Sequence, residues 1–318
     1  MLTKDCLAVL GIAMMLSLVF CLGLIPLLKK IGAGQNILSY VKEHKKKSGT
    51  PTFGGVAFLS AAVLACLFFW ERLTRDFAVV CVIGGAYTCV GLLDDLLKKI
   101  HRENKGLSAW QKLLFQVAVA LFAGGYCLKV GASRLTLPFG LGNVELGWWM
   151  MPLAVFVFLA TVNAVNLTDG LDGLAAGTAT PFFFFIGLIV LSFRGGELSL
   201  LCFALVGALA AYLIFNTSKA SLFMGDTGSL GLGGFASAIC LLSGRALYIP
   251  IIGGMFVVSV ISVILQVIYY KTTGGKRIFR MAPIHHHFQQ MGYSESKIAY
   301  VYAVITALMG VLCLLFEA

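Results

Sequence analysis

A pair of adjacent carboxylates is the first feature of this sequence that could do chemistry. Asp94 and Asp95 stand at the end of an apolar stretch in GLLDDLLKK, residues 91–99. Because neighbouring residues on a helix point about 100° apart, the two carboxylates should do different jobs. The alternative is that they are solvated charges at the end of a helix, where a carboxylate costs little free energy.

A second acidic segment, NAVNLTDGLDGLAAG, covers residues 163–177. On a helix its Asn166, Asp169 and Asp172 would share one face, because they recur every three residues. The two Asp-Gly pairs could instead form turns between helices. The segment contains no Lys or Arg, which indicates that a metal or basic residues from other loops complete it.

Asp226 lies in a third segment, NTSKASLFMGDTGSLGLGG, residues 216–234, together with Asn216 and Phe223. It precedes an apolar stretch, so it is either a helix N-cap residue or a ligand for Mg²⁺. Mg²⁺ binds through one or two carboxylates and leaves its other positions to water and substrate phosphates. Phe223 could pack on the membrane surface or stack on a flat base.

The segment MAPIHHHFQQMGYSE, residues 281–295, holds three consecutive histidines, His285, His286 and His287. They cannot all point at one metal from a regular helix, and the carboxylates elsewhere suit Mg²⁺ better than Zn²⁺ or Cu²⁺. Protonatable imidazoles in a basic segment suit phosphate or pyrophosphate. A solvated polar loop is the alternative.

Lysines accompany these segments. Lys47 precedes a Ser/Gly/Thr/Pro turn that leads into a helix, where lysine and backbone N–H groups can hold phosphate. A basic loop on a membrane surface would need no ligand. Lys98 and Lys112 follow the paired aspartates and could contribute to the same site.

Composition defines the surroundings of these groups. The chain has 318 residues, 59% of them hydrophobic and 12% charged, with a mean hydropathy of +0.92. Such a chain cannot coat a soluble globule, so we expect an all-α polytopic integral membrane protein that forms one domain over residues 1–318. Ten apolar spans are predicted, near residues 6–28, 53–70, 77–93, 110–128, 148–165, 173–193, 198–215, 229–243, 249–270 and 298–316.

Two of these spans need comment. The first is read as a retained helix, because it is too long for a signal peptide and its leader, MLTKD, has no net charge. The Gly-rich span at residues 229–243 is short, and its neighbours could shield it from lipid.

Basic residues give the orientation. If loops alternate, 17 of the 24 lysines and arginines fall on one side. The positive-inside rule makes that side cytoplasmic and places both termini outside. The cytoplasmic segments are then about 29–52, 94–109, 166–173, 216–228 and 271–297, and they contain all the candidate site residues except Lys112, which lies at the start of the next span. This basic face attracts anionic lipid or an anionic substrate.

Paired carboxylates, Mg²⁺ and basic clamps are the parts of a phosphoryl-transfer site. A membrane-embedded enzyme should act on a lipid, and its second substrate should be soluble and anionic; no nucleic acid is expected. A secondary transporter is the alternative from another class. Its ionisable residues should lie near the bilayer midplane on broken helices, whereas these lie at the inner ends of spans.

The five segments KSGTPTFGG, GLLDDLLK, NAVNLTDGLDGLAAG, NTSKASLFMGDTGSLGLGG and MAPIHHHFQQMGYSE resemble, in this order, the signatures of the phospho-N-acetylmuramoyl-pentapeptide-transferases. These belong to the polyprenyl-phosphate N-acetylhexosamine-1-phosphate transferases. The resemblance covers essentially the whole chain. It implies an enzyme of the bacterial cytoplasmic membrane that uses Mg²⁺ in peptidoglycan synthesis. The implied reaction transfers phospho-MurNAc-pentapeptide from UDP-MurNAc-pentapeptide to undecaprenyl phosphate, giving lipid I and UMP.

The resemblance also implies residue roles. Asp94, Asp95, Asp226 and His285 would be catalytic, with Asp226 holding the metal. The implied substrate-binding residues are Lys47, Lys98, Lys112, Asn166, Asp169, Asp172, Asn216, Phe223, His286 and His287. Phe223 would stack on uracil.

Two alternatives stay open at this point. A transferase of GlcNAc-1-phosphate from the same superfamily would share the aspartate segments, but PIHHHF followed by MGYSE resembles the muramoyl-pentapeptide enzymes specifically. The mechanism is either direct attack by the lipid phosphate or a two-step path through a covalent aspartyl intermediate. A homodimer is also possible, although lipid-facing apolar surface is the one interface signal.

Overall fold

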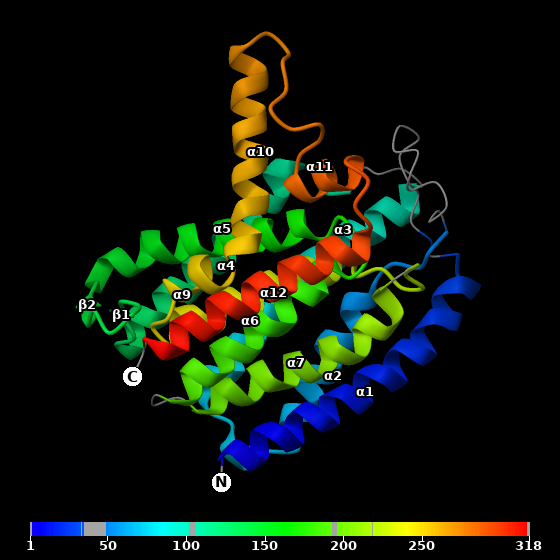
Figure 1. Cartoon of the computed structure of the whole chain (residues 1–318). Helices are drawn as coiled ribbons and strands as arrows, with labels where there is room; N and C mark the ends of the chain where they lie inside the picture. The colour runs from blue at the N-terminus through cyan, green and yellow to red at the C-terminus, as the bar shows by residue number, and fades with distance from the viewer. Residues whose placement is uncertain are drawn as a thin grey trace.

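The computed structural model describes residues 2–32, 34, 49–101, 106–192, 196–217 and 219–316, and in these ranges the protein is a bundle of α-helices (Figure 1). Its longer helices are α1 (Leu2–Lys30), α3 (Arg75–His101), α4 (Ala109–Val130), α5 (Met150–Thr168), α6 (Leu174–Leu191), α7 (Gly196–Asn216), α8 (Gly225–Leu242), α10 (Gly254–Thr272) and α12 (Glu295–Leu315). The shorter elements are α2 (Gly54–Leu67), α9 (Tyr248–Ile252), α11 (Ile284–Gln290), the 3-10 helices η2 (Trp70–Arg72) and η3 (Gly147–Trp149), and an antiparallel hairpin of β1 (Arg134–Thr136) and β2 (Asn143–Glu145).

Within the described ranges, eight helices are long and apolar enough to cross a membrane: α1, α3, α4, α5, α6, α7, α10 and α12. The chain is therefore an all-α multi-pass membrane protein, as its composition predicts. The other two predicted spans correspond to α2 and α8. With 14 residues, α2 is shorter than the roughly 20 that cross the hydrocarbon core, so the count of ten stays a prediction.

The eighth helix, α8, is enclosed by its neighbours, and every residue from Thr227 to Leu242 is buried. It packs on α3, α5 and α2. Small residues let these helices approach closely: an added Cβ on Gly91 of α3 would collide with the carbonyl of Asp226. This Gly-rich segment is thus shielded from lipid. It begins at Gly225 rather than at Ser229, so Asp226 lies in its first turn.

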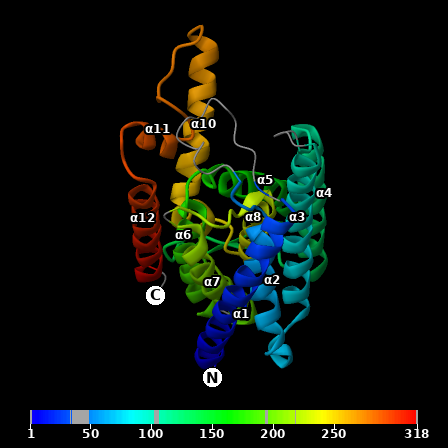
Figure 2. The same ribbon diagram turned by 90° about the vertical axis from the view of Figure 1, so that its right-hand side faces the viewer.

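The predicted span at 249–270 is two helices, because the chain breaks at Gly253 between α9 and α10. The N–H of Gly253 donates to the carbonyl of Ile249 at 2.8 Å and closes α9. The next helix, α10, leaves the bundle at a steep angle and projects beyond it (Figures 1 and 2). The chain then returns to place α11 beside the start of α12.

The two ends of the bundle differ. The N-terminal end of α1, the C-terminal end of α12 and the β1–β2 hairpin lie at one end, and α11 lies at the other (Figures 1 and 2). All four tryptophans are exposed at the ends of helices: Trp70, Trp110, Trp148 and Trp149. Tryptophan is enriched at membrane–water interfaces. Which end faces the cytoplasm stays a prediction.

Candidate active site

Two lysines and two aspartates form one ion-paired cluster. Nζ of Lys98 lies 2.6 Å from Oδ2 of Asp94 and 3.1 Å from Oδ2 of Asp226. Nζ of Lys112 lies 3.1 Å and 2.7 Å from the same two oxygens. Asp94 has no exposed surface, so its charge depends on these partners. We call these four residues the Asp–Lys cluster.

Helix α3 and the start of α4 position this cluster. The helix α3 continues past its predicted end, so Asp94 and Lys98 lie one turn apart on the same face. The chain then folds back, and the N–H of Leu107 donates to Oδ1 of Asp94 at 2.7 Å. Ser108 caps α4 through a reciprocal bond pair with Gln111, which fixes the turn of helix that carries Lys112.

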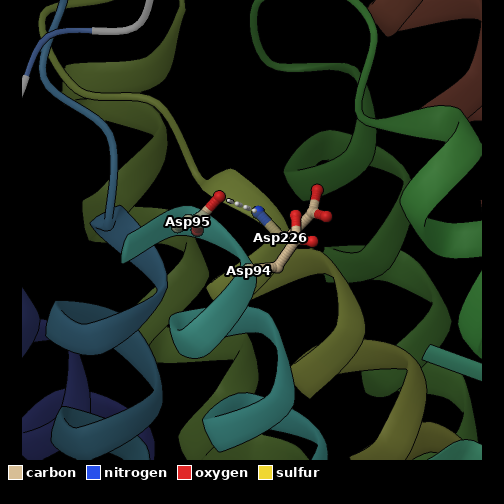
Figure 3. A group of neighbouring side chains, drawn as sticks. All are labelled: Asp94, Asp95 and Asp226. Carbon is tan, nitrogen blue, oxygen red and sulfur yellow. Dashed lines mark hydrogen bonds between the residues drawn. The ribbon is translucent and has the colours of Figure 1, made fainter. Parts of the chain in front are cut away.

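Asp95 points away from the cluster (Figure 3). Its oxygens accept the N–H of Asp226 at 3.2 Å, the N–H of Thr227 at 2.9 Å and the hydroxyl of Thr227 at 2.7 Å. A carboxylate at the N-terminus of α8 accepts hydrogen bonds from N–H groups that have no partner within the helix. Its negative charge also interacts favourably with the positive end of the helix dipole. Gly225 has a φ of 71°, and an added Cβ there would collide with Asp95. The two adjacent carboxylates therefore have different surroundings.

The side chain of Asp226 does not cap its own helix, so the N-cap alternative is wrong: Met224 holds that position and makes no side-chain cap bond. Instead, Oδ1 of Asp226 accepts Nδ2 of Asn166 at 3.0 Å, while the same amide donates to Ser229 at 2.8 Å. Thr227 and Ser229 are absent from the predicted site. Their place one and three residues after Asp226, in the first turn of a helix, is the signal that could have found them.

The acidic segment at 163–177 is a helix end followed by a turn. Helix α5 stops at Thr168, and Asp169 is its C-cap. The expectation that Asn166, Asp169 and Asp172 share one helical face is wrong, because the Asp-Gly pairs form a turn before α6 begins at Leu174. We call residues 169–173 the acidic turn.

Hydrogen bonds fix this acidic turn to the segment that follows α7. Oδ2 of Asp172 accepts the N–H of Ala220 at 3.0 Å. The N–H of Gly173 donates to Oδ1 of Asn216 at 3.1 Å, and Nδ2 of Asn216 donates to the carbonyl of Leu222 at 3.0 Å. Asn216 and Asp172, both buried, thus join the two loops in this structure.

The pKa of Asp169 is perturbed. Burial raises its pKa to about 8, and the carboxylates of Asp226, Asp95 and Asp172 act in the same direction. The protonation of this group is therefore sensitive to pH near neutrality and to any cation that binds among the aspartates.

Phe223 lies in the segment before α8, and backbone hydrogen bonds join this segment to the one before α2. Its N–H donates to the carbonyl of Pro51 at 2.8 Å, and its own carbonyl accepts the N–H of Gly54 at 2.8 Å. The ring is half-buried. Lys47, which precedes this stretch, lies outside the described residues.

The three histidines have three different surroundings. His285 is fully buried, and neither of its ring nitrogens has a hydrogen-bond partner among the residues that the structure describes. Burial lowers its pKa to about 3, and the neighbouring His286 adds to this shift, so the ring is neutral. His286 pairs with Gln289, whereas Nδ1 of His287 accepts the N–H of Arg280 at 3.1 Å.

Two of these rings pack against Gly170 in the acidic turn, where a larger residue would leave no room for them. An added Cβ on Gly170 would collide with Nε2 of His285 and lie 3.0 Å from Nε2 of His286. The structure thus brings the histidine segment to the same place as the acidic turn, and His287 is directed to the loop before α11.

The donor set fits a hard divalent cation. Among the described residues, one group of acids or imidazoles is compact enough to hold a metal: Asp94, Asp95 and Asp226, with one oxygen from each lying within 4.8 Å of the others. Carboxylate oxygens are the ligands that Mg²⁺ prefers. Because Asp95 already binds the N-terminus of α8, Asp94 and Asp226 have the oxygens best placed for a cation.

Comparison with known proteins connects this geometry to a family. The model for glycosyl transferase family 4 matches residues 77–244, which include both Asp94 and Asp226. A phospho-N-acetylmuramoyl-pentapeptide-transferase of Clostridium perfringens is 43% identical over 89% of this chain and 88% of its own length. The enzymes of the same name from Clostridium acetobutylicum and Listeria monocytogenes are each 41% identical over 92% of this chain, and 91% and 93% of their own lengths are covered.

Identity at this level over nearly the whole of both chains, together with the family match across the Asp–Lys cluster, leaves one assignment. The chain belongs to the phospho-N-acetylmuramoyl-pentapeptide-transferases, a branch of the polyprenyl-phosphate hexosamine-1-phosphate transferases.

Proposed function

We propose that this protein transfers phospho-MurNAc-pentapeptide from UDP-MurNAc-pentapeptide to undecaprenyl phosphate, giving lipid I and UMP for peptidoglycan synthesis. The chain lies in the bacterial cytoplasmic membrane, as its relatives and its helices indicate. Its lipid substrate therefore reaches the enzyme from the bilayer, and its nucleotide substrate from the water. The site end of the bundle would face the cytoplasm, where the nucleotide is made.

The observation that supports this function best is the Asp–Lys cluster. Both ammonium groups contact one oxygen of Asp94 and one oxygen of Asp226. Phosphoryl transfer is catalysed mainly by positioning and by neutralising charge on the transferring group. The two carboxylates could bind a divalent cation, and the two lysines could bind phosphate oxygens. The groups that would position and neutralise the phosphates are therefore in direct contact with each other.

Mg²⁺ held by Asp226 and Asp94 would neutralise the diphosphate of the donor and the negative charge that develops on UMP. Asn166 holds Oδ1 of Asp226 in place by its bond at 3.0 Å. Lys98 and Lys112 would exchange their carboxylate contacts for phosphate oxygens when substrate binds, because an ammonium group binds either anion.

In the direct mechanism, an oxygen of the lipid phosphate attacks the β-phosphorus of the donor. A new P–O bond forms, the bond from that phosphorus to the oxygen bridging to the α-phosphate breaks, and UMP leaves with the electron pair. Asp94 would position the lipid phosphate or accept its proton. Oδ1 of Asp94 accepts the N–H of Leu107, and Oδ2 contacts Lys98 and Lys112, so the carboxylate is held beside the two lysines that would bind phosphate oxygens.

The experiment that tests this function is product release. Purified protein is incubated with undecaprenyl phosphate and Mg²⁺, and UMP is measured with UDP-MurNAc-pentapeptide or with UDP-GlcNAc as donor. We expect release from the first donor alone. Equal release from both would favour the GlcNAc-1-phosphate alternative, and none from the first would contradict the proposal. A labelled covalent adduct formed without lipid would contradict the direct mechanism.

Other roles stay predictions. Stacking of Phe223 on uracil, contact of Lys47 with phosphate and a homodimer each follow from the resemblance or from general expectation. Substitution of Phe223 by leucine would test the first, because it keeps the apolar volume and removes the flat ring. A rise in the KM for the nucleotide donor with little change in kcat would support stacking.

A further inference from the structure

A hydrogen bond between α4 and α5 lies one helical turn from the Asp–Lys cluster. Nδ2 of Asn163, on α5, donates to Oε1 of the buried Gln116, on α4, at 2.9 Å. Gln116 follows Lys112 by four residues and therefore shares its face of α4. Asn163 precedes Asn166 by three residues and shares its face of α5. We call Gln116 and Asn163 the amide pair.

A second acceptor sets the direction of this bond. The same Nδ2 of Asn163 donates to the carbonyl of Leu159 at 2.8 Å. A backbone carbonyl only accepts hydrogen bonds, so Asn163 must turn its NH₂ group, and not its oxygen, toward both partners. Gln116 must then present its oxygen to Asn163. A side chain of similar shape that lacks a strong acceptor therefore cannot replace Gln116 in this bond.

The backbone of the same turn of α4 is held by α3. The hydroxyl of Tyr87 donates to the carbonyl of Gln116 at 2.8 Å, and both residues are buried. Tyr87 precedes Asp94 by seven residues, about two turns of α3. Its ring stacks on Phe158 of α5, with 5.4 Å between the ring centroids. Gln116 thus bonds to both neighbouring helices, through its side chain to α5 and through its backbone to α3.

These contacts determine where Lys112 lies. Its Nζ reaches Oδ2 of Asp226 at 2.7 Å from the first turn of α4. Asn166 holds the other oxygen of Asp226 from α5, at 3.0 Å. Lysine has a long and flexible side chain, so its ammonium group is placed only as well as the turn of helix that carries it. The amide pair fixes that turn against the helix that carries Asn166.

We propose that Gln116 and Asn163 are positioning residues: their hydrogen bond sets the distance between α4 and α5 at the active site and so holds Lys112 where it reaches a phosphate oxygen of the nucleotide-sugar substrate. The part about substrate rests on the proposed function. The part about the place of Lys112 rests on the amide pair and the Asp–Lys cluster.

Substitutions of similar shape separate positioning from stability. Asn163→Leu removes the donor from the buried oxygen of Gln116, which should lower the melting temperature. The double variant Asn163→Leu with Gln116→Met removes both polar groups. Replacing both partners by apolar groups of similar shape should restore most of the stability. The hydrogen bond is absent from both variants, so the double variant regains stability without regaining the positioning.

Kinetics of UMP release test the link to catalysis. Loss of a residue that orients a functional group, or a misplacement of about 1 Å, typically costs about 10-fold to 100-fold. We expect kcat to fall by that factor in Asn163→Leu and in the double variant alike. The KM for the nucleotide donor should change little, because the lost contact matters most in the transition state. A double variant with native kcat would overturn the proposal.

Tyr126→Phe is the matched control on the same helix. Tyr126 lies ten residues after Gln116, about 15 Å along α4, and its hydroxyl donates to Oδ1 of Asp76 on α3 at 2.6 Å. The variant therefore loses an interhelical bond of α4 far from Lys112. It should lower the melting temperature and keep the native kcat. An equal loss of kcat in Tyr126→Phe would mean that any weakening of α4 lowers activity, which would overturn a specific role for the amide pair.

Melting temperatures without substrate test the step from the amide pair to Lys112. Lys112 bonds to the aspartates and Asn163 bonds to Gln116, so independent effects of the two substitutions should add. Because the amide pair holds Lys112 in place, Lys112→Met should lower the melting temperature less in the Asn163→Leu background than in the native chain. Full additivity would overturn the proposal.

A second variant serves if Asn163→Leu does not fold. Gln116→Met alone removes the acceptor, and Asn163 is exposed, so its amide is not left buried. The same loss of kcat and the same coupling to Lys112 are expected, and native kcat would again overturn the proposal. If the native protein released no UMP, the proposed function would fail, whereas the coupling in melting temperature would still decide whether the amide pair places Lys112.

Discussion

Nζ of Lys112, in the first turn of α4, lies 2.7 Å from Oδ2 of Asp226, in the first turn of α8. The same ammonium group reaches Asp94 at 3.1 Å. These oxygens are the ones best placed for a divalent cation, so under the proposed function a lysine and a cation would compete for the same ligands. Lysines would then neutralise the acids until a cation binds, and would contact phosphate afterwards.

This competition predicts a thermal shift for Lys112→Met. Without Mg²⁺ the variant should unfold at a lower temperature than the native protein, because Asp94 is buried and loses one of its two cationic partners. Added Mg²⁺ should stabilise the variant more than the native protein, since ligand binding stabilises the folded state and one competitor is gone. Tryptophan fluorescence on heating measures both.

Lys129→Met, near the end of α4, is the control for loss of a lysine. It should show the native response to Mg²⁺. An equal response in Lys112→Met would mean that the cation does not bind where the lysine lies.

Asp226→Asn should abolish turnover and leave the fold intact. The amide keeps the shape of the side chain but removes the charge that binds Lys98 and Lys112 and the strongest oxygen ligand for a cation. We expect UMP release to fall by about 100-fold or more, the effect of removing one electrostatic contact in a transition state. The exposed Glu71→Gln on η2 should be unaffected. Retained activity in Asp226→Asn would remove this residue from the metal site.

Gly170→Ala tests the contact between the acidic turn and the histidine segment. The added methyl group would collide with Nε2 of His285 and lie 3.0 Å from Nε2 of His286, and such overpacking costs about 1–3 kcal/mol. Gly177→Ala, seven residues later in α6, is the matched control, because an added Cβ there meets no atom within 4 Å. We expect lower thermal stability and lower kcat in Gly170→Ala alone. Equal behaviour of the two variants would mean that α11 does not pack on the turn.

Much of the fold could be predicted from the sequence, because long apolar runs specify helices that cross a membrane. The sequence could not reveal which residues, distant along the chain, contact each other in the folded protein. The break at Gly253 lies in a long apolar run, and the pair Gly253 and Gly254 does not by itself distinguish a kink from close helix packing.

The same limit applies to the candidate site. Adjacent positions on α3 predict that Asp94 and Asp95 point in different directions, but the partner of each depends on where α8 begins. From the sequence, Asn216 is expected to be a polar loop residue, whereas in the structure its side chain is buried and forms hydrogen bonds that join two loops. The contact of Glu295 with Asp172 joins segments that no local pattern connects.

The raised pKa of Asp169 predicts how stability changes with pH. Its folded value of about 8 lies above the usual value of about 4, so between these values the folded protein binds more protons than the unfolded chain. The stability that this group contributes is complete below about pH 4 and is lost as pH rises through about 8. Asp169→Asn stays neutral at every pH and should escape this loss.

Melting temperatures of the native protein and Asp169→Asn, measured from pH 5 to pH 9 in detergent with EDTA, check this expectation. The variant should be more stable than the native protein at pH 9, and the difference should shrink toward pH 5, because protonation removes the repulsion from Asp226 and Asp95. EDTA matters, since a bound divalent cation would neutralise the same charges and lower the pKa of Asp169. A difference that does not vary with pH would show that Asp169 is ionised throughout this range and would contradict the raised pKa.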